Sequence, residues 1–289
     1  MSLTLQIGTR FDGGRPLIWS MMGEPALEAT GIHVPRPKRY RDILTGRVSE
    51  FDGTPATPAE LDQMLGLDQL DPREIPHFVL RITELMQPPR HFCPAGDWFY
   101  DIGPRAAQYR AIFAPAPLTF AISLRNPFAM LAQAAESGEY PGIDVIAPDP
   151  FTLRWAEVLR ALRESCPDVP ILAWAAEDAP MIWNRVLRSA MQRDIRISDA
   201  ATLHVARSMM NEEGSARLAD YLDSHPDMPD ALRARVIGIF LKRFAPACRV
   251  TDVPGHPDWT EAASARIDAH YADDLDQVAQ MDGVTLIRL

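Results

Sequence analysis

The sequence predicts a three-layer α/β domain with a mostly parallel sheet and a helical C-terminal portion. An apolar run at residues 3–8 stops at a glycine-containing loop, and the segments 117–124 and 170–175 are almost continuously apolar. Such runs are typical of strands that are buried on both faces of a parallel sheet. Segments with helical periodicity separate them, which indicates βαβ units with right-handed crossovers. Residues 199–245 then show helical periodicity throughout.

The individual elements follow from periodicity, caps and breakers. Strands are expected at 3–8, 90–93, 117–124, 170–175 and 284–288. Helices are expected at 17–30, 58–65, 74–87, from the turn after Arg125-Asn126-Pro127 to about 137, and at 151–165, 179–193 and 259–280. The Thr57-Pro58 pair is a start signal for the helix at 58–65. Residues 33–57 and 139–150 are rich in Pro and Gly and are expected to be long connections.

Composition limits the classes of function. The chain has 289 residues, 47% of them hydrophobic, and we expect one domain over 1–289 with a helical extension at 199–258. Its formal net charge of −10 argues against nucleic acid and against an anionic membrane as partners. Three widely spaced cysteines and the lack of a leader-like or membrane-spanning apolar run predict a cytoplasmic protein.

The N-terminal segment 3–19 has the layout of a phosphate cradle, in which a strand leads through a glycine loop into a helix. Most such loops carry a lysine, and this one has none. The chain has two lysines, Lys38 and Lys242, and both lie far from the loop in sequence. The segment therefore predicts the fold more strongly than it predicts chemistry.

Four landmarks occur in a characteristic order. They are the N-terminal strand with its glycine loop, a buried strand ending in Leu124-Arg125-Asn126-Pro127, the segment Ile171–Pro180 containing Glu177-Asp178, and a C-terminal helix with Tyr271 and Asp274 that is closed by Gly283. In this order and spacing the chain resembles the bacterial sulfotransferase-like branch of the P-loop superfamily. The resemblance implies a P-loop NTPase-like domain.

The resemblance also implies a donor, 3′-phosphoadenylyl sulfate, whose 5′-phosphosulfate is held by the loop. The residues that would hold it here are Arg10, Gly13, Gly14 and Arg15. Phe11 stands where the family has the lysine that neutralises the leaving oxygen. Asp12 adds a negative charge beside a polyanion, which is repulsive. The arginines in the loop offer partial compensation through bidentate contacts.

Two further positions are implied for the 3′-phosphate of the donor. Arg125 matches the family's arginine at the end of the central strand, and Gln133 stands where the family has a serine eight residues later. Arg125 alternatively makes only local contacts at the strand-to-helix turn. The general base would be Asp97, or alternatively His91. Asp178 fits an N-cap, so Glu177-Asp178 is expected to be a structural turn.

Two hypotheses for the function remain open. In the first, the protein transfers a sulfuryl group to a hydroxyl of a small molecule or glycan. In the second, the donor site has decayed, and the protein is a sulfotransferase-like module that binds another ligand or a protein partner. A transferase that uses a different anionic donor is also open. No metal is expected, because the His and Cys residues lack ligand spacing, and the sequence leaves the oligomeric state open.

Overall fold

The computed structural model describes residues 1–8, 11–71, 76–83, 101–137, 150–245 and 260–289. Within them, six strands form one parallel sheet in the order β2-β3-β1-β4-β5-β6. The strands are β1 (Ser2–Ile7), β2 (Ile32–His33), β3 (His77–Ile82), β4 (Leu118–Leu124), β5 (Ile171–Ala175) and β6 (Val284–Ile287). The expected α/β class and parallel sheet are confirmed.

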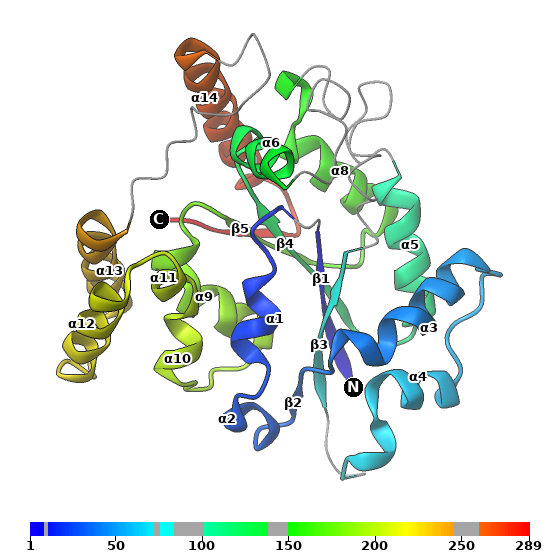
Figure 1. Ribbon diagram of the computed structural model, residues 1–289. Coiled ribbons are helices and arrows are strands. Elements are labelled where there is room, and N and C mark those ends of the chain that lie inside the picture. The colour runs from blue at the N-terminus through cyan, green and yellow to red at the C-terminus, as the bar shows by residue number, and fades with distance from the viewer. Residues whose placement is uncertain (9–10, 72–75, 84–100, 138–149, 246–259) are drawn as a thin grey trace.

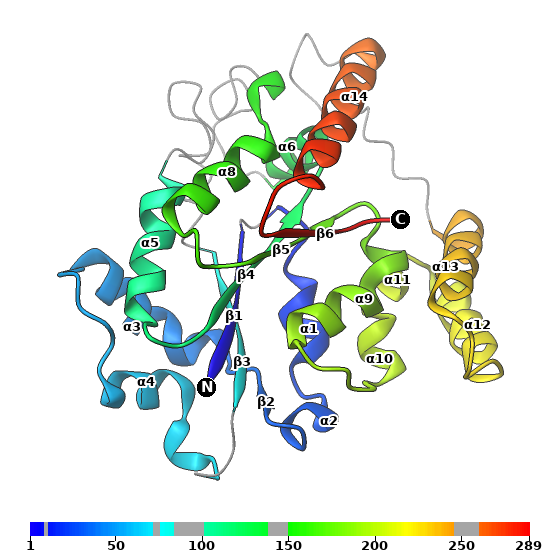
Figure 2. The ribbon, with the colours of Figure 1, turned by 180° about the vertical axis from the view of Figure 1, so that it is seen from behind.

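Helices cover both faces of this sheet, giving three layers (Figures 1 and 2). The helices are α1 (Pro16–Met21), α2 (Pro25–Glu28), α3 (Pro37–Ser49), α4 (Pro58–Leu65), α5 (Ile102–Ile112), α6 (Pro127–Glu136), α8 (Trp155–Ser165), α9 (Ala179–Met191), α10 (Asp199–Thr202), α11 (His204–Ser208), α12 (Glu212–Asp223), α13 (Asp230–Phe244) and α14 (Glu261–Val278). Two short 3-10 turns lie at Leu67–Gln69 and Pro150–Thr152 in the described part of the chain.

The central strand β1 divides two hydrophobic cores. Its residues Leu3, Leu5 and Ile7 belong to the core shared with α3, α5, α8 and α14. Thr4 and Gln6 alternate with them, as side chains on a strand must, and both are fully buried. The opposite core is formed by residues of α1, α9, α10 and α11. Two polar side chains of β1 therefore lie inside the molecule.

The sheet contains two strands that the sequence analysis missed, the two-residue β2 and the longer β3. A helix was expected at 74–87, but residues 77–82 form β3, which pairs with both β1 and β2. Five of its six residues are buried, and a short apolar run of this kind suits a buried strand as well as a helix. These residues form a strand rather than a helix because β3 pairs with a neighbouring strand on each side, β1 and β2. The strand expected at 90–93 lies outside the described residues.

Other boundaries also differ from expectation. The helix expected at 17–30 is two short helices, because Gly23 has a φ of +81° and Pro25 follows it. The expected connection 33–57 contains the 13-residue α3. The helix at 58–65 is confirmed, and Thr57 and Glu60 form a complete capping box.

The helices α10 to α13 form the helical C-terminal portion that the sequence predicted over 199–245. Helices α12 and α13 lie side by side at the edge of the molecule (Figures 1 and 2) and pack on α9 and α11. With α11 they share a small core around Leu218, Leu222, Val236 and Ile237. Residues 246–259 of the expected extension lie outside the described residues.

Candidate functional site

The carboxyl ends of β1, β4 and β5 meet at one edge of the sheet, because the three strands are parallel and adjacent. Ligands of open α/β sheets bind at this edge. The loop after β1 lies there, together with Arg125 after β4 and Glu177 after β5. The fold therefore brings together three of the four landmarks read from the sequence, and α14 adds the fourth.

The carboxylate of Asp12 lies inside the glycine loop. Asp12 is fully buried, and its Oδ1 accepts a hydrogen bond from the backbone N–H of Gly14 at 2.8 Å. A Cβ atom on Gly8 would come within 1.6 Å of Asp12 Oδ2. Only a glycine at position 8 leaves room for this carboxylate. The requirement is steric, because the φ of Gly8, +159°, corresponds to extended backbone. A loop N–H group that a bound anion would use is thus already taken by a side chain.

Two buried polar side chains lie beneath the loop. A Cβ on Gly14 would come within 2.4 Å of Gln6 Nε2, and one on Gly13 would lie 3.6 Å from Ser123 Oγ. Neither the Gln6 amide nor the Ser123 hydroxyl has a hydrogen-bond partner among the described residues. The sequence reasoning did not single out either residue. Gln6 had a signal, since it is a polar side chain within an apolar strand segment.

Arg125 reaches back to the loop. Its Nη1 donates a hydrogen bond to the backbone oxygen of Phe11 at 2.7 Å and also donates to Gln133 Oε1. The two residues expected at the 3′-phosphate are therefore adjacent to each other and to the loop. Gln133 uses its oxygen in this contact, so it acts as an acceptor here, and both of these acceptors of Arg125 are uncharged.

The remaining loop residues differ in their surroundings. Phe11, expected at the position of the family's lysine, is 7% exposed and packs into the core on the α5 side of the sheet. Arg15 precedes α1, is exposed, and stacks over the Trp19 ring at 5.4 Å. Gly13 has a φ of +78°, which favours glycine. Arg10, His91 and Asp97 lie outside the described residues.

A second polar cluster joins β4, β5 and α14. The hydroxyl of Tyr271 lies 2.7 Å from the Leu124 carbonyl and 2.6 Å from Glu177 Oε2, so its proton is available to either acceptor. Glu177 Oε1 accepts the backbone N–H of Asn126 at 2.9 Å. Burial, with the charge of Glu177 beside it, raises the pKa of Tyr271. These contacts bind the C-terminal helix to the site edge.

Asp178 has a different partner from the one expected. It occupies the N-cap position of α9, but its side chain makes no cap hydrogen bond there. Instead, its Oδ2 accepts the backbone N–H of Leu289 at 2.9 Å. The Glu177-Asp178 pair thus ties two C-terminal segments, around Tyr271 and Leu289, to the end of β5.

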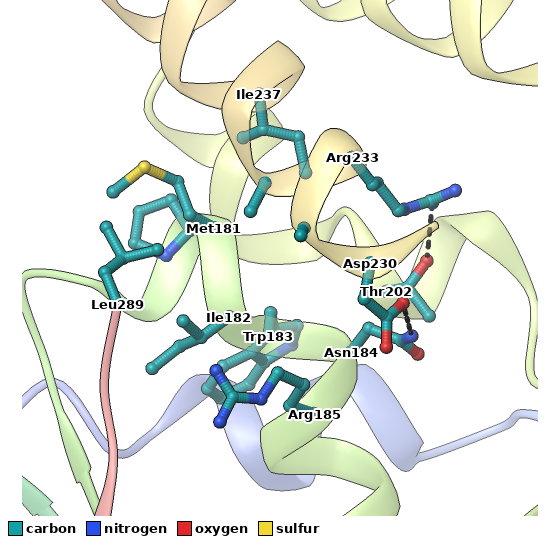
Figure 3. Close-up of a pocket in the computed structure, with 13 residues that line it drawn as sticks. Met181, Ile182, Trp183, Asn184, Arg185, Thr202, Asp230, Arg233, Ile237 and Leu289 are labelled. Carbon is teal, nitrogen blue, oxygen red and sulfur yellow. Dashed lines mark hydrogen bonds between the residues drawn. The ribbon is translucent and has the colours of Figure 1, made fainter. Parts of the chain in front are cut away.

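A separate cavity of about 470 Å³ lies between α9 and α13 (Figure 3). Most of its lining is apolar, including Met181, Ile182, Trp183, Ile237 and Leu289. One end is polar, formed by Asn184, Thr202, Asp230 and Arg233, and these four residues also line a neighbouring polar hollow of about 690 Å³. The volume is in the range of small-molecule sites. Sequence reasoning missed this cavity, because its lining comes from distant segments.

The polar end of the cavity is held by hydrogen bonds between α9, α10 and α13. Asn184 Nδ2 donates to Asp230 Oδ1 at 3.1 Å, and Arg233 Nη2 donates to Asp199 Oδ1 at 2.6 Å. Arg188 adds a longer contact of 3.4 Å to Asp230. The Asp230 carboxylate keeps acceptor capacity, because an ionised carboxylate has about four lone-pair sites.

Comparison with known proteins adds no family. A scan of the chain against protein-family models finds no match, and neither does a search of curated proteins. Within the described residues, no group of three or more His, Cys, Asp or Glu side chains is arranged to hold a metal ion. In the same part of the chain, no helix is long and apolar enough to cross a membrane. Fold and site together define a three-layer α/β protein with a glycine loop at the carboxyl edge of its sheet.

Proposed function

We propose that this protein is a sulfotransferase-like binding module that does not transfer a sulfuryl group. The position of Asp12 carries the proposal, because its buried carboxylate accepts the Gly14 N–H inside the loop. A donor phosphate would compete for the same N–H group and would meet a charge of its own sign. The loop residues therefore do not fit the 5′-phosphosulfate of 3′-phosphoadenylyl sulfate.

The residue at position 11 supports the same proposal. In sulfuryl transfer a cation neutralises the oxygen that leaves, and such charge stabilisation is a large part of catalysis. Phe11 has no charge and is buried in the core. Lys38 lies in α3 and Lys242 in α13, so neither lysine comes from the loop. A binding role needs no such cation.

One observation favours sulfuryl transfer as a second candidate function. Arg125 and Gln133, expected at the 3′-phosphate, do meet beside the loop. In an enzyme, Arg125 would exchange the Phe11 carbonyl for a phosphate oxygen, which is a stronger, charge-assisted acceptor. The acceptor would be a hydroxyl of a small molecule or glycan.

The cavity between α9 and α13 is the candidate ligand site of the binding module. Its apolar wall suits a compact apolar body, and the polar end around Asp230 suits one hydrogen-bond donor of the ligand. The expected cytoplasmic location belongs to the proposal as well, and the free, buried thiol of Cys166 is compatible with it.

Calorimetry with adenosine 3′,5′-bisphosphate tests the proposal. We expect no binding by the wild type at millimolar nucleotide. Micromolar binding that Arg125→Ala abolishes would overturn the proposal and favour the transferase. Inclusion of Arg185→Ala provides a matched control, because Arg185 lies at the α9–α13 cavity and not at the loop.

The variant Asp12→Asn tests the reason for the closed loop. Asparagine keeps the shape of the side chain and an oxygen that can accept the Gly14 N–H, but it removes the charge. If repulsion by Asp12 excludes anions, Asp12→Asn will bind the nucleotide more tightly than the wild type. Equal absence of binding in both would show that the loop backbone, rather than the charge, excludes the anion.

A further inference from the structure

Exposed apolar side chains are concentrated on one part of the molecule. Six large hydrophobic residues are exposed among the described residues, and four of them fall between residues 209 and 239. These four are Met209, Tyr221, Leu232 and Ile239. Helices α12 and α13, which carry three of them, stand at the outer edge of the structure (Figure 1). Contiguous exposed apolar surface on a globular protein is a mark of an interaction site.

The outer face of α13 combines apolar and basic side chains. Leu232, Arg235, Ile239 and Lys242 follow one another at spacings of three and four residues, so they lie on one face of the helix. Leu232 is 48% exposed and Ile239 is 58% exposed. Neither Arg235 nor Lys242 forms an ion pair with any described residue. The stripe is thus basic in a chain whose net charge is −10.

The outer face of α12 has the opposite charge. Glu213, Asp220 and Asp223 are exposed at helical spacing, and Asp227 continues the series in the turn after the helix. Glu213 is partly neutralised by Arg217 on the same helix, at 2.8 Å. Asp220 and Asp223, which lie further along, carry most of the uncompensated charge. The opposite side of α12 is buried through Gly214, Leu218 and Leu222.

We propose that a second copy of this chain docks on the α12–α13 hairpin through a two-fold axis. In such an isologous contact the same surface serves both copies. The acidic stripe of α12 in one copy would lie against the basic stripe of α13 in the other. By symmetry, the basic stripe of α13 in the first copy would lie against the acidic stripe of α12 in the second. Leu232 and Ile239 would be buried between them, and the four helices would form a bundle.

The charge pattern favours this occupant over an anionic membrane. A membrane would attract the α13 stripe but would repel the acidic α12 stripe beside it, as well as the net charge of −10. A second copy offers a basic stripe to the acidic one and an acidic stripe to the basic one. Complementary charges at a contact mainly set partner choice and association rate, and the apolar residues between them supply the burial.

Sedimentation or light scattering measures the expected association. The wild type should show a mass twice the 32.2 kDa of the chain at protein concentrations of tens of micromolar. The dimer should weaken as salt rises from about 0.05 to about 0.5 M, because exposed charges are screened over such a range. A mass of one chain at all salt concentrations would overturn the proposal.

Charge reversals identify the surface. Arg235→Glu and Asp220→Arg should each weaken the dimer at least tenfold, and the double variant should recover at least half of the loss by restoring opposite signs. Arg160→Glu, an exposed reversal on α8, is the matched control and should leave the dimer intact. A dimer whose affinity is unchanged by both Arg235→Glu and Asp220→Arg would overturn the proposal. So would a monomer that floats with phosphatidylserine vesicles and loses this binding in Arg235→Glu.

Discussion

Asp274 Oδ1, on α14, accepts a hydrogen bond from the backbone N–H of Ala156 at 3.0 Å, in the first turn of α8. Asp274 Oδ2 also accepts the N–H of Trp155. Arg154, at the N-cap position of α8, makes no cap hydrogen bond with its own side chain. A carboxylate nearly 120 residues away in sequence therefore does the work of a local cap.

Replacing Asp274 should destabilise the protein. Asp274→Ala leaves two buried N–H groups unpaired, and we expect a loss of about 2 kcal/mol in the free energy of unfolding. Burial raises the pKa of Asp274, so its charge is costly there. Asp274→Asn, which is neutral but can still accept one hydrogen bond, should lose about 1 kcal/mol. Urea unfolding measures both variants.

The neighbouring residue Asp273 is the control for this prediction. Its side chain is 62% exposed and pairs with Arg154 at 2.7 Å. Exposed ion pairs contribute about 0 to 1 kcal/mol, so Asp273→Ala should lose clearly less than Asp274→Ala. Equal losses would show that the carboxylate of Asp274 does not cap α8.

His77 should make stability depend on pH. It is buried at the start of β3, its Nδ1 lies 2.8 Å from Ser2 Oγ, and its Nε2 lies 3.1 Å from the Ala190 carbonyl. A carbonyl can only accept, so Nε2 carries the proton and Nδ1 accepts from the serine. Burial lowers the pKa of His77 below its ordinary value. The folded state therefore holds the neutral ring.

The direction in which stability changes with pH follows from this lowered pKa of His77. The neutral ring contributes stability above the unfolded pKa of about 6.5, and this stability is lost as pH falls towards the folded pKa, by up to about 1.4 kcal/mol per pH unit. Urea unfolding between about pH 7.5 and 5 should show a steeper loss for the wild type than for His77→Gln. His225→Gln, at an exposed site, should keep the wild-type slope. Identical slopes in all three proteins would contradict the prediction.

Tyr271→Phe should loosen the contact between α14 and the sheet. The change removes the donor of the hydrogen bond to the Leu124 carbonyl and the Glu177 carboxylate, while the Leu124 carbonyl keeps the N–H of Ala176 at 2.8 Å. We expect a loss of about 2 kcal/mol in the free energy of unfolding. Tyr221→Phe, on the exposed side of α12, should change it by less than about 0.5 kcal/mol. Thermal and urea unfolding measure the free energy of unfolding of both variants, and equal losses would contradict the prediction.

The sequence predicted the strands that have a clear apolar pattern and missed those with ambiguous signals. The apolar run that becomes β4 has β-branched and aromatic residues and ends at an Arg-Asn-Pro turn, so it was found. Residues 77–82 are as buried as β4, but their surroundings suggested a helix. Only pairing with β1 and β2, which no local pattern encodes, makes them a strand.

The candidate site was predicted in outline. Arg125, Gln133 and the loop after β1 lie together, as the resemblance to the sulfotransferase-like family implied. The orientation of Asp12 could not be predicted, because the sequence shows its charge but not that Gly8 leaves room for it. The α9–α13 cavity could not be predicted from the sequence either, because it depends on how α13 packs against α9 in the folded protein.

Filling that cavity should abolish binding of an apolar probe. Ala234 lines the space between α9 and α13, and Ala234→Leu adds three carbon atoms to it, which removes room for a ligand and buries new apolar surface. The neutral fluorescent probe N-phenylnaphthylamine should bind the wild type, and we expect at least tenfold weaker binding to Ala234→Leu. Ala272→Leu, at an exposed position on α14, adds the same atoms elsewhere and should bind as the wild type does. If both variants bind the probe equally well, the cavity is not its site.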